Sequence, residues 1–190
     1  MKRVVWAIGL LVVAGSGLVA CGGSSSAPAP LATSVNQTTC KSGQLRIVAG
    51  KSGAAAGTIG QTILFTNVSK TSCTIAGYPR VTALSTDGKM VLTARPKLDG
   101  MVGGIQSGTT IHVVTLDPGQ VASAEVEGGD VPTGSATSCQ TYLAFLVTPP
   151  GQAVSTQITA GATGSNLPGF QGCEAITVNP VVPGTTGGTP

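Results

Sequence analysis

The sequence predicts an all-β domain, an antiparallel β-sandwich, between two chain ends of different composition. Short segments in which apolar and polar residues alternate recur along the middle of the chain, and Gly- and Pro-rich turns separate them. No convincing helical periodicity interrupts this pattern. Four cysteines beyond the first 21 residues add the expectation of two disulfides. Together these observations favour two packed sheets that disulfides reinforce.

The first two expected strands are QLRIVA, residues 44–49, and TIGQTILFTNVS, residues 58–69. In the first, Leu45 and Ile47 share one face, whereas Arg46 lies on the other. This period of two is typical of a strand with one buried face. The second segment is rich in β-branched residues, which favour strands.

Two turns of specific chemistry are expected between the later strands. Asp87-Gly88, within STDGKMV, suits a tight hairpin turn that needs a positive φ. In TIHVVTLDPGQVASAEVE, Pro118 presets the φ of the first central turn position, and Gly119 takes the positive φ of the second. The sequence therefore predicts a hairpin at Asp87 and one strand on each side of Pro118.

The last expected strands are TYLAFLVTPP, residues 141–150, and CEAITVNP, residues 173–180. The former is apolar on both faces and ends at two prolines, as expected for a central strand covered on both sides. Short strands at these intervals, rich in Val, Ile and Thr, predict an immunoglobulin-like antiparallel sandwich. The only tryptophan is Trp6, so we expect a mainly aliphatic core.

Residues 1–20 have the pattern of an export signal. Lys2 and Arg3 precede a mostly apolar run, which is shorter and more interrupted than a typical membrane-spanning helix. The run ends in Leu-Val-Ala-Cys, which resembles a bacterial lipobox, so Cys21 is the expected lipidation site. Its acyl chains would anchor the chain to a membrane. The alternatives are an ordinary signal peptide with a chance cysteine and an uncleaved anchor.

The segments on either side of the expected domain are low in complexity. Residues 21–39 consist mainly of Gly, Ser, Ala, Pro and Thr, which predicts a flexible tether. Residues 182–190 predict a loose tail, and residues 40–181 form the expected sandwich domain. Beyond residue 20, eight Lys and Arg stand against seven Asp and Glu. This near-neutral balance argues against a nucleic-acid partner, which requires a clustered basic surface.

The four remaining cysteines are expected to pair, because the chain is predicted to be exported. Three connectivities are possible. Cys40 and Cys73 are neighbours among the cysteines in the sequence, as are Cys139 and Cys173. Crossed and nested pairings need much longer closures. The spacing therefore favours Cys40–Cys73 and Cys139–Cys173.

Several segments together resemble a known family. They are FTNVSKTSCTIAGYP, VVTLDPGQVASAEVE, a cysteine before an apolar strand, and a final cysteine shortly before ITVNP. This combination is similar to the actinobacterial domain-of-unknown-function family 4232, found in secreted proteins and lipoproteins, from Cys40 to Val181. The resemblance implies an extracytoplasmic β-sandwich with paired cysteines. It implies no catalytic or binding residues.

Candidate residues for catalysis or metal binding are few. His112 is the only histidine, and no Gly-x-Ser-x-Gly accompanies it, so we expect it at a strand edge or rim. Met90, Met101 and His112 could supply soft ligands for copper(I), but their spacing matches no motif. Glu125 and Glu127 alternate on one strand and share a face that we expect to be solvated. We therefore expect no enzymatic activity, no cofactor and no metal.

One long connection differs from the others. RPKLDGMVGGIQSGTT, residues 95–110, is Gly-rich and lacks strand periodicity, and loops of this length are often functional or disordered. Arg95 and Lys97 could contact an anionic partner there. The alternative is a mobile surface loop with solvated charges.

The expected function is that of a non-enzymatic binding or structural module of the cell envelope, anchored on the extracytoplasmic face of the cell membrane. Its partner would be an envelope protein or a small ligand that binds loops or a sheet edge. The alternative is a carrier or chaperone of a small ligand, such as a lipid, a glycan or a metal ion. An apolar cavity between the two sheets would favour the carrier, because an interaction module needs none.

Overall fold

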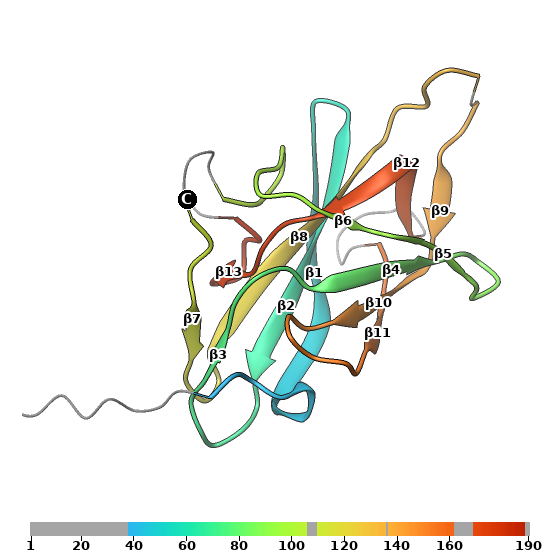
Figure 1. The fold of residues 1–190 in the computed structure, drawn as a ribbon. Coiled ribbons are helices and arrows are strands. Elements are labelled where there is room, and N and C mark those ends of the chain that lie inside the picture. Colours follow the sequence, from blue (N-terminus) through green and yellow to red (C-terminus); the bar gives the residue numbers. More distant parts are fainter. Residues whose placement is uncertain (1–37, 106–109, 136, 162–168, 189–190) are drawn as a thin grey trace, which may run out of the picture. The chain divides into compact units, whose positions relative to one another are not determined.

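The computed structural model describes residues 38–105, 110–135, 137–161 and 169–188, which belong to one compact unit, Asn36–Pro190. These residues form thirteen strands and one short 3-10 helix, η1 (Ser42–Gln44). Figure 1 shows how the strands are arranged. The strands are β1 (Leu45–Ala55), β2 (Thr58–Asn67), β3 (Cys73–Ile75), β4 (Arg80–Leu84), β5 (Met90–Thr93), β6 (Arg95–Pro96), β7 (Val114–Leu116), β8 (Val121–Gly129), β9 (Gln140–Tyr142), β10 (Ala144–Thr148), β11 (Thr156–Thr159), β12 (Phe170–Val178) and β13 (Val182–Pro183). The all-β prediction is confirmed. Within these ranges, no helix has the length and apolar character needed to cross a membrane.

Most strands belong to two sheets. The larger sheet has the order β1-β2-β8-β12-β6, with β13 added to β8 and β9 added to β12. The smaller sheet has the order β11-β10-β4-β5, and β3 pairs with β7 as a separate ribbon. The pairings between these named strands are antiparallel, as predicted, except for the parallel pairing of β12 with β6.

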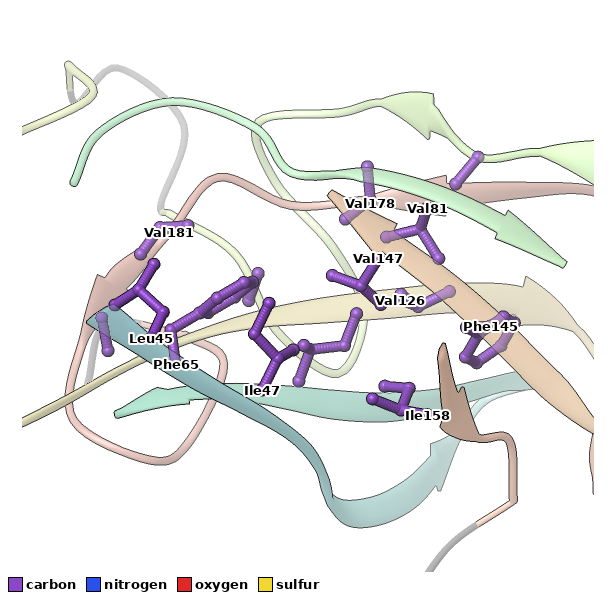
Figure 2. Packing of buried hydrophobic residues seen from close by; sticks show 14 of the residues in the cluster. Leu45, Ile47, Phe65, Val81, Val126, Phe145, Val147, Ile158, Val178 and Val181 are labelled. Atoms are coloured by element: carbon purple, nitrogen blue, oxygen red, sulfur yellow. The ribbon is translucent and has the colours of Figure 1, made fainter. Parts of the chain in front are cut away.

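The core lies between the two sheets. Along β2, Ile63 and Phe65 are fully buried, and along β8 the inward residues Ala124 and Val126 are fully buried as well. One cluster joins these side chains to others from the smaller sheet, and Figure 2 shows several of its members. Labelled members from the smaller sheet are Val81, Phe145, Val147 and Ile158. Burial of this apolar surface provides the main stabilisation of the sandwich.

The segment predicted as one central strand, residues 141–150, forms two. β9 ends at Tyr142 and pairs with β12 of the larger sheet, whereas β10 begins at Ala144 and lies between β11 and β4 of the smaller sheet. Leu143, between them, has 40% of its surface exposed. The chain therefore changes sheets at Leu143, as strands do at the corners of sandwiches. The prediction of a central strand holds for β10.

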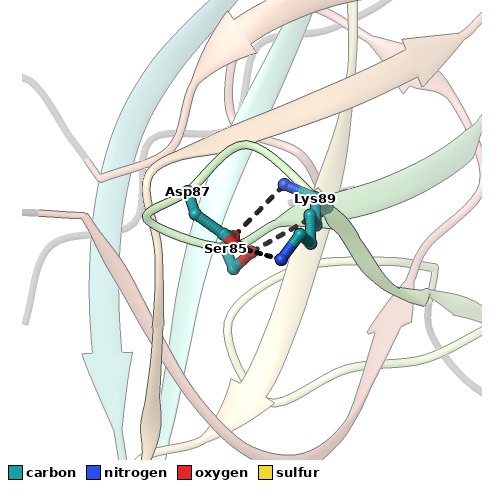
Figure 3. A network of polar contacts seen from close by, with 3 residues as sticks. All are labelled: Ser85, Asp87 and Lys89. Atoms are coloured by element: carbon teal, nitrogen blue, oxygen red, sulfur yellow. Dashed lines mark hydrogen bonds and ion pairs between the residues drawn. The ribbon is translucent and has the colours of Figure 1, made fainter.

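The predicted hairpin turn joins β4 to β5. Gly88 has φ 79°, as a tight turn requires. Figure 3 shows Ser85 donating a hydrogen bond to the Asp87 carboxylate, while the Lys89 ammonium lies 2.8 Å from the same side chain. The pKa of Asp87 is below its usual value, mainly because of the interaction with Lys89 and next because of that with Ser85. The other predicted turn is also present, with Gly119 at φ 83°.

Asn67 at the end of β2 organises the turn that follows. Its side chain is buried, and its Nδ2 donates to the carbonyl oxygens of Thr71 and Leu116 at 2.8 Å each. Its Oδ1 accepts from the backbone N–H of Ser69 at 3.0 Å. The amide thereby links the turn before β3 to the end of β7, which accounts for a polar residue in the core of this segment.

Both predicted disulfides are present. Cys40–Cys73 joins the segment before η1 to β3, with a Cα–Cα distance of 4.9 Å. Cys139–Cys173 joins the segment before β9 to β12, with a Cα–Cα distance of 4.4 Å. The pairing of neighbours in the sequence is confirmed.

We expect the double substitution Cys40→Ser/Cys73→Ser to lower the free energy of unfolding by about 4 kcal/mol, as the chain-entropy model predicts for a loop of this size. Urea denaturation under oxidising conditions measures the loss. The bond Cys139–Cys173 closes a loop of 34 residues against 33, so its removal provides a size-matched comparison. Peptide mapping without reductant checks the pairing, and a peptide linking Cys40 to Cys139 would contradict it.

Residues 182–188 differ from the loose tail that their composition predicts. β13 pairs with Ala122 and Ser123 of β8, and Val182 is buried. The cause is the geometry of β8: β12 pairs with only its C-terminal half, from Val126 onward, which leaves its N-terminal half open to the chain end. The domain therefore includes part of the segment expected to be a tail.

Candidate functional site

Part of the outer face of the larger sheet, away from the core, is covered by two Gly-rich segments. These are residues 100–104 and residues 184–188, which contact each other through a hydrogen bond of 2.9 Å from the Gly104 N–H to the Gly187 carbonyl oxygen. The Gly187 N–H in turn donates to the hydroxyl of Ser123 on β8 at 2.9 Å. The side chains that point outward from β8 thus lie under backbone rather than under water.

Glu127 lies under the first of these segments and is 3% exposed. Its carboxylate accepts hydrogen bonds from the backbone N–H groups of Met101, Val102 and Gly103, at 3.1, 2.6 and 2.9 Å. Successive N–H groups that converge on one anion form a nest, and hydrogen bonds to a charged acceptor are strong. A side chain at Gly100 would collide with the carboxylate. Glu127 therefore fixes segment 100–104 on the sheet.

Asn179, which is fully buried, holds the beginning of the same connection. Its Nδ2 donates to the carbonyl oxygens of Lys97 and Asp99, at 3.1 and 3.2 Å. Arg95 lies in β6 beside β12, and both Arg95 and Lys97 are exposed. Residues 95–105 thus differ from the mobile loop considered above, and residues 106–109 lie outside the described residues.

Glu125, two residues earlier on β8, is 1% exposed. The hydroxyl of Thr62 donates to its Oε2 at 2.7 Å. Side chains at Gly60, Gly103 or Gly187 would collide with Glu125, so glycine at these positions makes room for it. Burial raises the pKa of Glu125 to about 8, against a lowering effect of the Thr62 hydrogen bond, and the charge of Glu127 raises it further. At neutral pH most molecules therefore carry Glu125 as an uncharged acid.

The structure corrects the prediction that Glu125 and Glu127 form a solvated face. They do share a face of β8, but both are buried. The covering segments come from distant parts of the sequence and approach closely because they are rich in glycine. The signal available in the sequence was GMVGG at 100–104, since such runs often mark close approach of backbone to another group, but it does not name the partner.

A cleft opens beside Glu125 on this outer face, with a volume of about 470 Å³. It lies where the register of β1 and β2 shifts between Ala49 and Ser52. Small-molecule sites typically have volumes of about 300 to 1,000 Å³. Besides Glu125, its lining includes Ala49, Lys51, Thr62, Leu64, Val102 and Thr186. The cleft therefore has the size and the mixed apolar and polar walls of a small-ligand site.

The other candidate residues are dispersed. Cys21 lies outside the described residues. His112 is exposed and lies two residues before the start of β7. Met90 in β5 and Met101 over the larger sheet are 72% and 57% exposed. Within the described ranges, no three His, Cys, Asp or Glu residues gather as potential metal ligands.

The fold and the site define a disulfide-linked β-sandwich with a ligand-sized cleft on the outer face of its larger sheet. A family model described as a domain of unknown function, DUF4232, matches residues 40–182, so the chain belongs to this family. The resemblance noted in the sequence is thereby confirmed at the level of the family. No curated protein and no solved structure shows significant similarity to the chain.

Proposed function

We propose that the protein is a lipid-anchored module on the extracytoplasmic face of the cell membrane, which binds a ligand in the cleft beside Glu125 without altering it chemically. The observation that carries this proposal is a preformed cleft with a buried acid of raised pKa in its wall. Strongly perturbed acids in clefts are concentrated at functional sites. The two disulfides support an oxidising compartment.

The groups around Glu125 support binding rather than catalysis. Thr62 supplies a hydrogen bond, Glu127 is itself engaged by backbone N–H groups, and the glycines supply space. Acid–base or nucleophilic catalysis would require a second reactive group held within reach of the same ligand atom. The arrangement instead resembles a binding site in which apolar walls surround a few polar groups.

The position of the cleft bears on the choice between an interaction module and a carrier. The space between the sheets is occupied by the core cluster, whereas the cleft opens on the outer face of the larger sheet. This favours a site for an exposed small ligand, or for the protruding group of a larger partner. A carrier that encloses its ligand between the sheets has less support.

We test the binding role by titrating the full-length protein in detergent micelles with a library of small neutral, cationic and anionic fragments. Fragments that bind in the cleft are expected to shift the NMR signals of the backbone amides of Thr62, Leu64 and Val102. The hairpin residues Ser85 and Asp87 serve as internal controls, because they lie outside the cleft lining. If no fragment shifts the cleft amides at millimolar concentration, the binding role is wrong.

The anchor is tested by Cys21→Ala. We expect this variant to leave the membrane fraction and to lose incorporation of labelled fatty acid, because stable anchoring requires two or more acyl chains. Ser24→Ala, three residues after Cys21 in the predicted tether, is the matched control and should remain in the membrane fraction. A Cys21→Ala protein that is still lipid-labelled and membrane-bound would refute lipidation at this site.

A further inference from the structure

Building on the proposed binding function, we propose that the cleft recognises an organic ammonium group, which pairs with the carboxylate of Glu125. The ligand class is therefore an amine whose charged head reaches Glu125 and whose carbon chain lies against the apolar wall. The same cleft would bind the corresponding alcohol or carboxylic acid much more weakly.

The first argument is that Glu125 has no cationic partner in the part of the chain that the structure describes. Among the described residues, no lysine or arginine forms an ion pair with it, and the hydrogen bond from Thr62 is a neutral one. The side chain is nevertheless held in a fixed place, because Gly60, Gly103 and Gly187 pack against it. A buried carboxylate without a countercharge is costly, so the protein alone keeps Glu125 protonated, and a ligand cation would supply the countercharge that the ionised form needs.

The second argument is the local charge. Glu127 lies on the same face of β8, and its charge adds to the burial that raises the pKa of Glu125. The other charged residue in the lining is Lys51 of β1, which is exposed. Water and salt screen an exposed ammonium far more than a buried carboxyl group. The inner part of the cleft therefore favours a cation.

The third argument is the chemistry of the walls. An ammonium group has three N–H donors, and besides Glu125 the hydroxyl groups of Thr62 and Thr186 are available acceptors in the lining. Ala49, Leu64 and Val102 offer an apolar surface for a carbon chain. A divalent metal ion instead takes six or more oxygen ligands, usually with several carboxylates. One acid in a wall of hydroxyl groups and apolar side chains suits an ammonium group better.

Binding is coupled to loss of the proton from Glu125. The ammonium ligand keeps its own protons, Glu125 releases one proton to solvent, and the two opposite charges pair. Below about pH 8, each molecule must first lose that proton, so affinity is expected to rise about tenfold for each pH unit and to level off above it. The charged groups that face this equilibrium are Glu127 on β8 and Lys51 on β1, while β2 contributes the hydroxyl group of Thr62.

The experiment is calorimetric titration of the full-length protein in detergent micelles with n-butylammonium chloride at pH 6, 7 and 8.5. We expect affinity to rise about tenfold between pH 6 and pH 7, with close to one proton released per amine at pH 6. Glu125→Gln should weaken binding at least tenfold and remove the pH dependence. Asp130→Asn, an exposed acid just beyond β8, is the matched control and should bind as the parent does. Lys51→Gln should bind slightly more tightly.

Several results would overturn the ammonium assignment. They are an affinity independent of pH, undiminished binding to Glu125→Gln, weaker binding to Lys51→Gln, or tighter binding of n-butanol, n-butyrate or calcium ion. The fragment titration separates this failure from that of the binding role. If other fragments shift the amides of Thr62 and Leu64 while the amine does not, only the ammonium assignment fails. If no fragment shifts them, both proposals fail.

Discussion

Replacing Glu125 with glutamine is expected to remove a pH dependence from the stability of the protein. In the parent protein, titration of Glu125 should lower the free energy of unfolding by roughly 4 kcal/mol between about pH 5 and pH 8. The parent carries an acid whose pKa is about 8 in the folded protein, against an ordinary value of 4.5. Glutamine has nearly the same shape and does not titrate. We therefore expect the variant to be the more stable protein at pH 8.

The sign of the effect follows from proton binding. Between pH 4.5 and pH 8, the folded protein holds a proton on Glu125 that the unfolded chain has released. Raising the pH therefore favours the unfolded chain, by about 1.4 kcal/mol for each pH unit. The protonated Glu125 side chain makes its full contribution to stability below pH 4.5, and this contribution is lost as the pH approaches 8. Above pH 8 both states have released the proton, so the contribution changes no further.

Urea denaturation of both proteins across this pH range measures the effect. The difference between variant and parent isolates Glu125, because all other titrating groups are shared. Asp130→Asn should retain the slope of the parent, since Asp130 is exposed. Parallel curves for the parent and Glu125→Gln would show that Glu125 is charged in the folded protein, in contradiction to its burial.

Much of the fold could be predicted because its signals are local. Alternation places Ile47 in the core, and the turn chemistry of Gly88 and Gly119 fixes where two turns lie. The disulfides follow from short closure, as Cys40–Cys73 shows. Each of these inferences depends on residues close in the sequence, or on a count that allows few alternatives.

The change of sheet at Leu143 was not predictable from the same information. An apolar run predicts one buried strand, regardless of whether its two halves pair in one sheet or in two. What divides it is the pairing of Tyr142 with Phe170 and of Ala144 with Leu84 and Thr159, all distant in the sequence. The period of two carries no information about which sheet supplies the partner strand.

The candidate site depends almost entirely on such distant contacts. Glu125 and Glu127 alternate with apolar residues, which is the pattern of an exposed face, and only the covering segments reverse that interpretation. One covering segment lies about 25 residues before Glu127, and the other lies about 60 residues after Glu125. Composition alone predicts only that both segments are loops. The raised pKa of Glu125 is mainly a consequence of this burial, so it could not be predicted from the sequence either.

Replacing Glu127 with alanine is expected to lower the free energy of unfolding by about 5 kcal/mol, since three hydrogen bonds to a charged acceptor are lost. The N–H groups of Met101, Val102 and Gly103, in the segment that covers the sheet, would lose their acceptor. These hydrogen bonds are partly buried, and a partly buried donor without a partner costs more than the net value of its bond. Urea denaturation measures the loss, and Asp130→Ala, at an exposed acid nearby, should change stability by less than about 0.5 kcal/mol.

A second measurement shows whether the nest is the cause. Amide hydrogen exchange at Met101 and Val102 should become much faster in Glu127→Ala than in the parent, because their N–H groups bond to the carboxylate. The N–H of Lys97 bonds instead to the carbonyl oxygen of Val178, and Asn179 holds the same stretch, so its protection should fall only in proportion to global stability. Glu127→Gln keeps one acceptor oxygen and should lie between parent and alanine variant. Equal exchange at Met101 in all three proteins would mean that the carboxylate does not hold this segment, and that other contacts, such as the hydrogen bond from the Gly104 N–H to Gly187, keep it in place.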